Sequence, residues 1–208
     1  MQRTPEPPAE IPSPWLRRFL LLIRPGGRVL DLAAGGGRHV QLLRAAGYQV
    51  VAVDRDVARL EARFAGDSGC EIKVMDLEDG GPWRLGGGFD GIVVTHYLHR
   101  PLLPHLPGAL AAGGVLLYET FMAGNERFGR PSNPDFLLQP GELLTAFAAL
   151  TVIAFEQGAV DAPRPAMIQR LAARHGAIGR LPATRRRSET RLLKAASGLR
   201  IQLVNATD

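Results

Sequence analysis

Small and acidic residues that follow an apolar run are the feature of this chain most suggestive of chemistry. Val29-Leu30 leads into Asp31, and the glycines Gly35-Gly36-Gly37 come directly before Arg38. A side chain at the first or last of these glycines would hinder a tight turn and keep a ligand from lying against the main chain. The free N–H groups of a helix that begins here can hold a carboxylate or a phosphate. The segment therefore predicts a ligand-binding turn.

The spacing of the glycines does not match that of a dinucleotide-binding turn. A dinucleotide-binding turn follows the pattern Gly-x-Gly-x-x-Gly. Counted from Gly35 and Gly37 the third glycine would stand at Val40, and counted from Ala33 and Gly35 it would stand at Arg38. Neither register fits. The alternative is a nucleotide-binding oxidoreductase, which predicts thermal stabilisation by NAD.

A second acidic residue stands where a ribose would need it. Asp54 ends the apolar run Val50–Val53, about twenty residues beyond the glycine turn. A carboxylate in this place can accept hydrogen bonds from both hydroxyls of a ribose. The alternative is a surface aspartate that caps the helix starting near Asp56.

The stretch Asp31–Gly37 resembles the first motif of the class I S-adenosylmethionine-dependent methyltransferases, roughly Asp-Leu-x-x-Gly-x-Gly. Ala33 stands where that family often has glycine. The resemblance covers residues 13–172 and implies methyl transfer, with S-adenosylmethionine as cofactor and S-adenosylhomocysteine as product. It also implies that Asp76 takes the exocyclic amine of adenine while a neighbouring N–H meets a ring nitrogen; the alternative is a plain turn residue. The predicted cofactor-binding residues are Asp31, Ala33, Gly35, Gly37, Arg38, Asp54, Arg55, Met75, Asp76, Leu77, Thr95 and His96.

Candidate catalytic residues follow the predicted strand 91–95, in a segment that resembles the family's fourth motif. Thr95, His96 and Tyr97 should face the methionine part of the cofactor and the substrate entrance. His96 could act as a general base, because an unperturbed imidazole with a pKa of about 6.5 is largely neutral at pH 7. Tyr97 and Glu119 are further candidates, and a merely hydrogen-bonding His96 is the alternative. No metal site is predicted.

The long loop Met122–Pro140 follows the fifth predicted strand, where substrate is usually met in this fold. With Tyr118–Phe121 it resembles a bacterial subgroup loosely related to tellurite-resistance methyltransferases. We expect a lid or a substrate collar, against the alternative of a structural loop held by Asn and Asp turns. The arginines hint at an anionic group on the substrate. The predicted substrate-binding residues are Trp15, Arg100, Asn125, Arg127 and Arg130.

Alternating strands and helices must position these residues. The apolar runs predict strands at 28–32, 49–53, 71–75, 91–95, 115–119, 151–155 and 166–171. Helices are expected from Ser13-Pro14, where Ser is the N-cap, and at 38–46, 56–64, 102–112 and 141–149. The pattern predicts an α/β fold, three-layered and doubly wound (Rossmann-like), with a mostly parallel seven-stranded sheet whose last strand is antiparallel.

Composition divides the chain into three parts. Residues 1–12 form a Pro-rich arm, 13–172 the methyltransferase-like domain, and 173–208 a basic, Arg-rich tail. The net charge is +5, while residues 164–208 alone carry +8, so residues 1–163 carry about −3 and the basic character belongs to the tail. Two interpretations of the arginines in the tail stay open. They reflect a compositional bias of the source genome, or they bind the phosphates of RNA or DNA. A single cysteine, Cys70, excludes an internal disulfide and favours the cytoplasm, and no apolar run is long enough for a membrane span.

Several functions fit this organisation. The absence of an added substrate domain favours methyl transfer to a small molecule. The alternatives are an RNA or protein methyltransferase that uses the basic tail, and a methyltransferase-like protein that binds cofactor without turnover.

Overall fold

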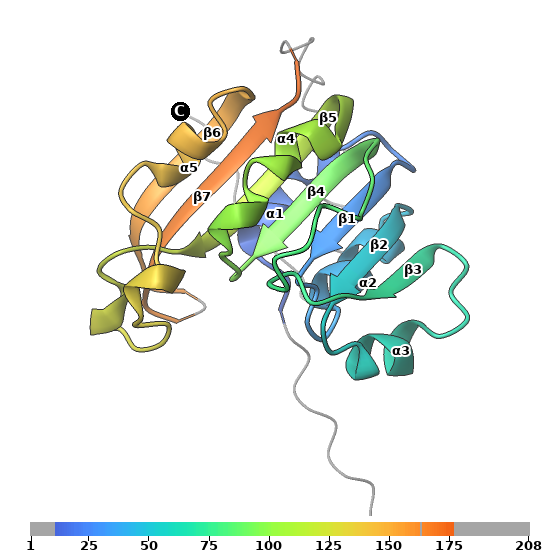
Figure 1. Cartoon of the computed structure of the whole chain (residues 1–208), viewed down its shortest axis with the longest axis horizontal. Coiled ribbons are helices and arrows are strands. Elements are labelled where there is room, and N and C mark those ends of the chain that lie inside the picture. The colour runs from blue at the N-terminus through green and yellow to red at the C-terminus, as the bar shows by residue number, and fades with distance from the viewer. Residues whose placement is uncertain (1–10, 163, 177–208) are drawn as a thin grey trace, which may run out of the picture. The chain divides into compact units, whose positions relative to one another are not determined.

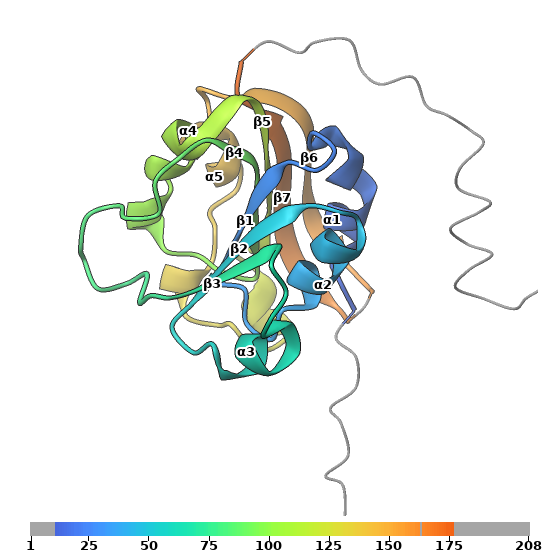
Figure 2. The same cartoon turned by 90° about the vertical axis from the view of Figure 1, so that its right-hand side faces the viewer.

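The computed structural model describes residues 11–162 and 164–176, and these form a sheet with helices on both faces (Figures 1 and 2). The strands are β1 (Arg28–Leu32), β2 (Gln49–Asp54), β3 (Cys70–Val74), β4 (Phe89–Thr95), β5 (Leu110–Phe121), β6 (Thr151–Val160) and β7 (Ala166–Arg174). The helices are α1 (Pro14–Phe19), α2 (Arg38–Ala45), α3 (Ala58–Phe64), α4 (His105–Ala109) and α5 (Glu142–Ala146). Short 3-10 turns are η1 (Leu20–Leu22), η2 (Arg100–Leu102), η3 (Asn125–Arg127) and η4 (Pro134–Phe136).

The seven strands run in the order β3-β2-β1-β4-β5-β7-β6. The pairs from β3 to β5 are all parallel, and β7 is antiparallel to both of its neighbours. This confirms the predicted fold class, including the antiparallel last strand. The chain continues outward from β1 through β2 and β3, then returns to the other side of β1 at β4. At such a reversal the loops diverge and leave a crevice at the carboxyl ends of the strands.

Two hydrophobic cores cover the two faces of the sheet. On one face α1, α2 and α3 pack Trp15, Val40 and Leu60 against the strands. On the other face α4 and α5 contribute Leu106 and Leu143. Burial on both faces explains why the central strands read as continuous apolar runs.

The first helix is fixed to the sheet by its cap. The Ser13 hydroxyl accepts the N–H groups of Trp15 and Leu16 at 3.1 and 3.3 Å, as the sequence predicts for an N-cap. The same hydroxyl donates to Glu119 on β5 at 2.9 Å. Trp15 is 2% exposed and its indole N–H donates to the Leu171 carbonyl at 3.1 Å. Trp15 is therefore a core residue that anchors α1, which corrects its prediction as a substrate contact.

The boundaries of some elements differ from those predicted. The helix expected over 102–112 is only α4, because the chain turns extended at Leu110, which pairs with Phe89 in the sheet. The helix expected over 141–149 is likewise shorter, since the chain must enter β6 at Thr151. β7 continues two residues beyond the expected end of the domain at residue 172.

Most of the predicted arm and tail lie outside the described residues. This applies to residues 1–10 and 177–208, including the helix and strand that the pattern weakly indicates after residue 190. Across the part of the chain that the structure describes, no helix is long and apolar enough to cross a membrane.

Candidate functional site

The turn between β1 and α2 exposes main chain to open space. Its backbone is left-handed at three positions, with φ of 56° at Ala33, 55° at Gly35 and 79° at Gly37. A Cβ on Gly35 would meet no atom within 4 Å, whereas a Cβ on Gly37 would lie 2.5 Å from Phe64 and 2.8 Å from Leu60. Gly37 is therefore required for packing against α3. Gly35 keeps the main chain accessible to a ligand.

The carboxylate of Asp54 ties the end of β2 to this turn. One oxygen accepts the N–H of Gly35 at 2.7 Å and the other accepts the N–H of Asp56 at 3.1 Å. An ionised carboxylate can accept about four hydrogen bonds. Asp54 therefore holds the glycine turn in place and keeps acceptor capacity for a ligand.

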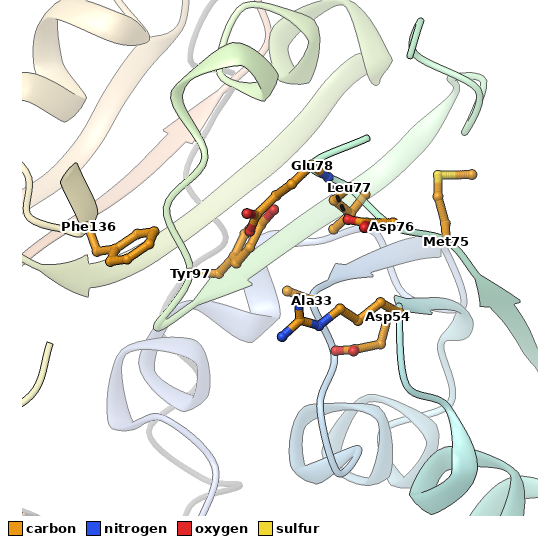
Figure 3. Close-up of a pocket in the computed structure, with 9 residues that line it drawn as sticks. Ala33, Asp54, Met75, Asp76, Leu77, Glu78, Tyr97 and Phe136 are labelled. Atoms are coloured by element: carbon orange, nitrogen blue, oxygen red, sulfur yellow. Dashed lines mark hydrogen bonds between the residues drawn. The ribbon is translucent and has the colours of Figure 1, made fainter. Parts of the chain in front are cut away.

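A cavity of about 330 Å³ lies at the carboxyl ends of β1 to β4 (Figure 3). We call it the main cavity. It is lined by Ala33, Asp54, Arg55, Met75, Asp76, Leu77, Glu78, Tyr97 and Phe136. The first six belong to the predicted cofactor set, so the structure brings them together from three strand ends. The volume is within the range of small-molecule sites.

A second cavity of about 220 Å³ adjoins the first, and we call it the side cavity. It is lined by Glu78, His96, Tyr97, Leu98, Thr120, Phe121, Pro131 and Phe136. Three residues line both spaces: Glu78, Tyr97 and Phe136. A ligand in the main cavity and a second molecule in the side cavity would therefore meet at these three side chains.

Asp31 is a buried carboxyl group next to the glycine turn. It is 1% exposed, and neither of its oxygens has a hydrogen-bond partner among the described residues. Burial raises the pKa of Asp31 to about 7, opposed by the positive charge of Arg38 and, more weakly, by the backbone N–H of Val40. A buried acid without a partner is costly unless a ligand or a proton neutralises it.

Arg38 fixes the tautomers of two histidines. It donates from Nη2 to Nδ1 of His96 at 3.0 Å and from Nε to Nε2 of His39 at 3.1 Å. A guanidinium has no acceptor, so both contacted ring nitrogens must be acceptors. In the neutral forms the proton therefore lies on Nε2 of His96 and on Nδ1 of His39, which donates to the Thr95 hydroxyl at 3.0 Å.

Both imidazoles are neutral at pH 7. Desolvation and the charge of Arg38 lower the pKa of His39 to about 3 and that of His96 to about 4. The remaining nitrogen of neutral His96 carries a proton and can only donate. This geometry favours a hydrogen-bond donor over the general base that the sequence suggests.

His96 is held in an unusual backbone conformation. Its φ is 54°, which is uncommon for a residue with a side chain. Its N–H donates to the Glu119 carbonyl at 2.9 Å, and its ring stacks on Phe121 with centroids 4.9 Å apart. These contacts direct the ring toward the side cavity that it lines.

The other two catalytic candidates are Tyr97, whose hydroxyl stays protonated, and Glu119, which lies outside both cavities. Burial and the nearby Glu78 raise the pKa of Tyr97, so its hydroxyl keeps its proton at pH 7. Glu119 is buried, accepts the Ser13 hydroxyl at 2.9 Å and lies 3.4 Å from Arg170. Glu119 lines neither the main nor the side cavity, but a small hollow of about 50 Å³ next to His96.

The polar residues predicted to bind substrate instead stabilise the loop. Arg100 pairs with both oxygens of Glu142, at 2.7 and 3.0 Å, and donates to the carbonyls of Asp135 and Leu137. The Asn125 amide donates to the Pro131 carbonyl at 3.0 Å and accepts the Met167 N–H at 3.1 Å. Their hydrogen-bonding capacity is largely used within the protein, which corrects the prediction for both.

The long loop contributes apolar rather than charged side chains to the cavities. Arg127 and Arg130 line neither of them, whereas Pro131 and Phe136 do. Reasoning from the sequence missed Phe136 and also Glu78. Glu78 could have been found, because it continues the segment that begins at Met75, but nothing in the sequence distinguishes Phe136.

Comparisons with known proteins agree with this architecture. A family model described as "Methyltransferase domain" matches residues 8–151. The search of curated proteins finds no match. TehB from Haemophilus influenzae has a similar structure, with a TM-score of 0.64 and 18% identity, and the match covers 78% of this chain and 61% of TehB.

Two further structures resemble the chain at similar identity. A TehB-like SAM-dependent methyltransferase from Corynebacterium glutamicum has a TM-score of 0.57 at 19% identity, covering 78% of this chain and 87% of its own. An S-adenosylmethionine dependent methyltransferase from Mesorhizobium loti has a TM-score of 0.58 at 19% identity, covering 78% and 98%. At such identities these structures show the shared fold.

Proposed function

Because the chain belongs to the class I S-adenosylmethionine-dependent methyltransferase family, we propose that it methylates a small-molecule acceptor in the side cavity. One arrangement carries this proposal: Ala33 of the turn after β1, Asp54 and Asp76 line one cavity, which meets a second cavity at Glu78, Tyr97 and Phe136. The alternatives that depend on the basic tail concern residues outside the described part of the chain.

The lining of the main cavity and the buried Asp31 together offer a partner for each part of the cofactor. Asp54 would accept the ribose hydroxyls, and Asp76 would accept the adenine amine. The bare main chain at Gly35 leaves room for the ligand. The partnerless carboxyl of Asp31 would be neutralised by the α-ammonium group of the methionine part.

Bound S-adenosylmethionine supplies a methyl group on a positively charged sulfur, which becomes a neutral thioether when the methyl leaves. The protein therefore needs to stabilise little new charge and mainly aligns the reactants, which can contribute up to about 7–11 kcal/mol in the best cases. His96 and Tyr97 both carry protons at pH 7, so they orient the acceptor as donors. Phe121 and Phe136 give the side cavity an apolar wall.

S-adenosylhomocysteine is expected to stabilise the protein against heat. A ligand at 100 times its Kd adds about 2.7 kcal/mol, which raises the Tm of a domain of this size by roughly 5–10 °C. NAD at the same concentration is expected to leave the Tm unchanged, because the turn lacks the dinucleotide spacing. Thermal unfolding of the full chain with each ligand tests this. A shift with NAD and none with S-adenosylhomocysteine would reverse the assignment.

Cofactor affinity is expected to fall on acidification below about pH 7. The raised pKa of Asp31 means that its carboxyl is mostly protonated below that pH and must lose the proton to pair with an ammonium. Each unit below pH 7 therefore costs up to about tenfold in affinity for S-adenosylhomocysteine.

The variant Asp31→Asn isolates this effect. It should bind more weakly at pH 7.5 and lose the pH dependence between about 5.5 and 7.5, where the ligand's α-amino group stays mostly protonated. Isothermal titration calorimetry at several pH values measures both. An unchanged slope in the variant would mean that Asp31 does not face the ammonium group.

A further inference from the structure

The side cavity has a charge character that restricts what can occupy it. Apart from Glu78, its lining holds no residue that is charged at pH 7, since His96 is neutral there. No Lys or Arg lines it among the described residues. Arg38 lies behind His96, and its guanidinium is used by two imidazoles. An anionic acceptor in the side cavity would face a carboxylate and no Lys or Arg in the lining of that cavity.

The carboxylate of Glu78 is also available to a ligand. None of the ion pairs found within residues 11–162 and 164–176 uses it. The neighbouring acid Asp79 differs, because it pairs with Arg84 and accepts the Gly81 N–H at 2.7 Å. Glu78 therefore takes part in none of these ion pairs at the junction of the two cavities, and Arg55 is the cation that shares the lining of the main cavity with it.

Aromatic rings surround this charge. Figure 3 shows the Glu78 carboxylate next to the ring of Tyr97, and the ring of Phe136 to the left of both. Phe121 completes the apolar wall of the side cavity. Phe136 is 47% exposed, although it is a large apolar side chain. A carboxylate beside aromatic faces suits a cation with an apolar body, since both attract an ammonium group.

We propose that the methyl acceptor is a small amine with an aromatic or aliphatic body, and that its ammonium group pairs with Glu78 in the side cavity. This inference rests on the proposed function and specifies its substrate class. It replaces the anionic substrate that the arginines of the sequence suggest, because Arg100 is engaged with Glu142 and the loop arginines line neither cavity.

The reaction balances with no further reactant. The ammonium group first loses a proton, through Glu78, to water. The nitrogen lone pair then forms the N–C bond to the methyl carbon, and the electron pair of the breaking C–S bond returns to sulfur. The products are a methylated ammonium ion, the neutral thioether and one proton in solution. Glu78 is exposed to solvent at the cavity rim, so it can pass that proton on.

Three probes of nearly equal shape test the charge preference. The full chain is saturated with S-adenosylhomocysteine and titrated in a calorimeter with 2-phenylethylamine, 2-phenylethanol or 3-phenylpropanoate. The amine is expected to bind about tenfold more tightly than the alcohol, from its ion pair and ring contacts together. The carboxylate is expected to bind more weakly than the alcohol.

Two variants test whether Glu78 causes the preference for the amine over the alcohol. Glu78→Gln should weaken amine binding about tenfold and leave alcohol binding unchanged, so the readout is the ratio of these two affinities at saturating S-adenosylhomocysteine. Asp79→Asn is the matched control, because Asp79 is the next acidic residue and does not line the side cavity. It should bind all three probes as the unsubstituted chain does.

The possible failures are distinguishable. If S-adenosylhomocysteine does not bind, the proposed function fails and the inference fails with it. If it binds but the amine shows no preference at millimolar concentration, the amine proposal alone is overturned. The amine proposal alone is also overturned if Glu78→Gln weakens the binding of S-adenosylhomocysteine and leaves the binding of the amine unchanged.

Discussion

Replacing Asp54 with alanine is expected to lower the affinity for S-adenosylhomocysteine by at least about 100-fold. The substitution removes the acceptor of two charge-assisted hydrogen bonds to the ribose, each worth about 1.5–3 kcal/mol. It also releases the Gly35 N–H, which Asp54 holds at 2.7 Å. The loss therefore combines missing ligand contacts with a loosened glycine turn. Isothermal titration calorimetry with the folded variant measures it.

A neighbouring carboxylate supplies the control. Asp56 accepts the Ala58 N–H at 3.2 Å at the start of α3 and does not line the main cavity. Asp56→Ala should therefore cost about 1 kcal/mol of stability and change the affinity for S-adenosylhomocysteine by less than about twofold. Equal affinities for Asp54→Ala and the unsubstituted chain would remove Asp54 from the binding site.

Replacing Gly37 with alanine is expected to destabilise the fold by about 2–4 kcal/mol. The added Cβ would lie 2.5 Å from Phe64 and 2.8 Å from Leu60, in a backbone conformation with φ of 79°. The left-handed conformation costs about 1–2 kcal/mol for a residue with a side chain, and overpacking adds about 1–3. The lower flexibility of the unfolded chain offsets up to about 1 kcal/mol. Urea unfolding measures the difference.

A substitution at Gly47 separates the cost of backbone strain from the cost of overpacking. Its φ is 86°, close to that of Gly37, but a Cβ there would meet nothing within 4 Å. Gly47→Ala should therefore cost only the backbone strain, about 1 kcal/mol. Similar losses at both positions would show that Phe64 and Leu60 can make room for a Cβ at Gly37, and that this glycine is not required for packing against α3.

The cofactor side of the site could be predicted from the sequence because it depends on short-range patterns. Each of its residues follows an apolar strand directly, as Ala33, Asp54 and Asp76 do. In a parallel sheet the carboxyl ends of neighbouring strands share one edge. Once the strands were recognised, these residues had to converge, and they line one cavity.

The acceptor side could not be predicted in this way. Arg100 pairs with Glu142, which lies 42 positions away, and no local pattern indicates that pair. Phe136 reaches the cavities from a loop whose path depends on the contacts of Asn125. Charge in the sequence therefore suggested an anionic substrate, while the folded chain has used Arg100 within the protein.

The role of His96 shows the same dependence on tertiary contacts. An isolated imidazole after a strand suggests a base, since its ordinary pKa is near 6.5. In the structure Arg38 occupies one ring nitrogen and lowers the pKa to about 4. Arg38 belongs to a different motif, so only the fold brings the two together.

A crystal structure of the chain with S-adenosylhomocysteine tests the central claim most directly. We expect both ribose hydroxyls within hydrogen-bond distance of the Asp54 carboxylate, the adenine amine at Asp76, and the sulfur at the junction formed by Glu78, Tyr97 and Phe136. A ligand bound outside the main cavity, or with its ribose away from Asp54, would contradict the account.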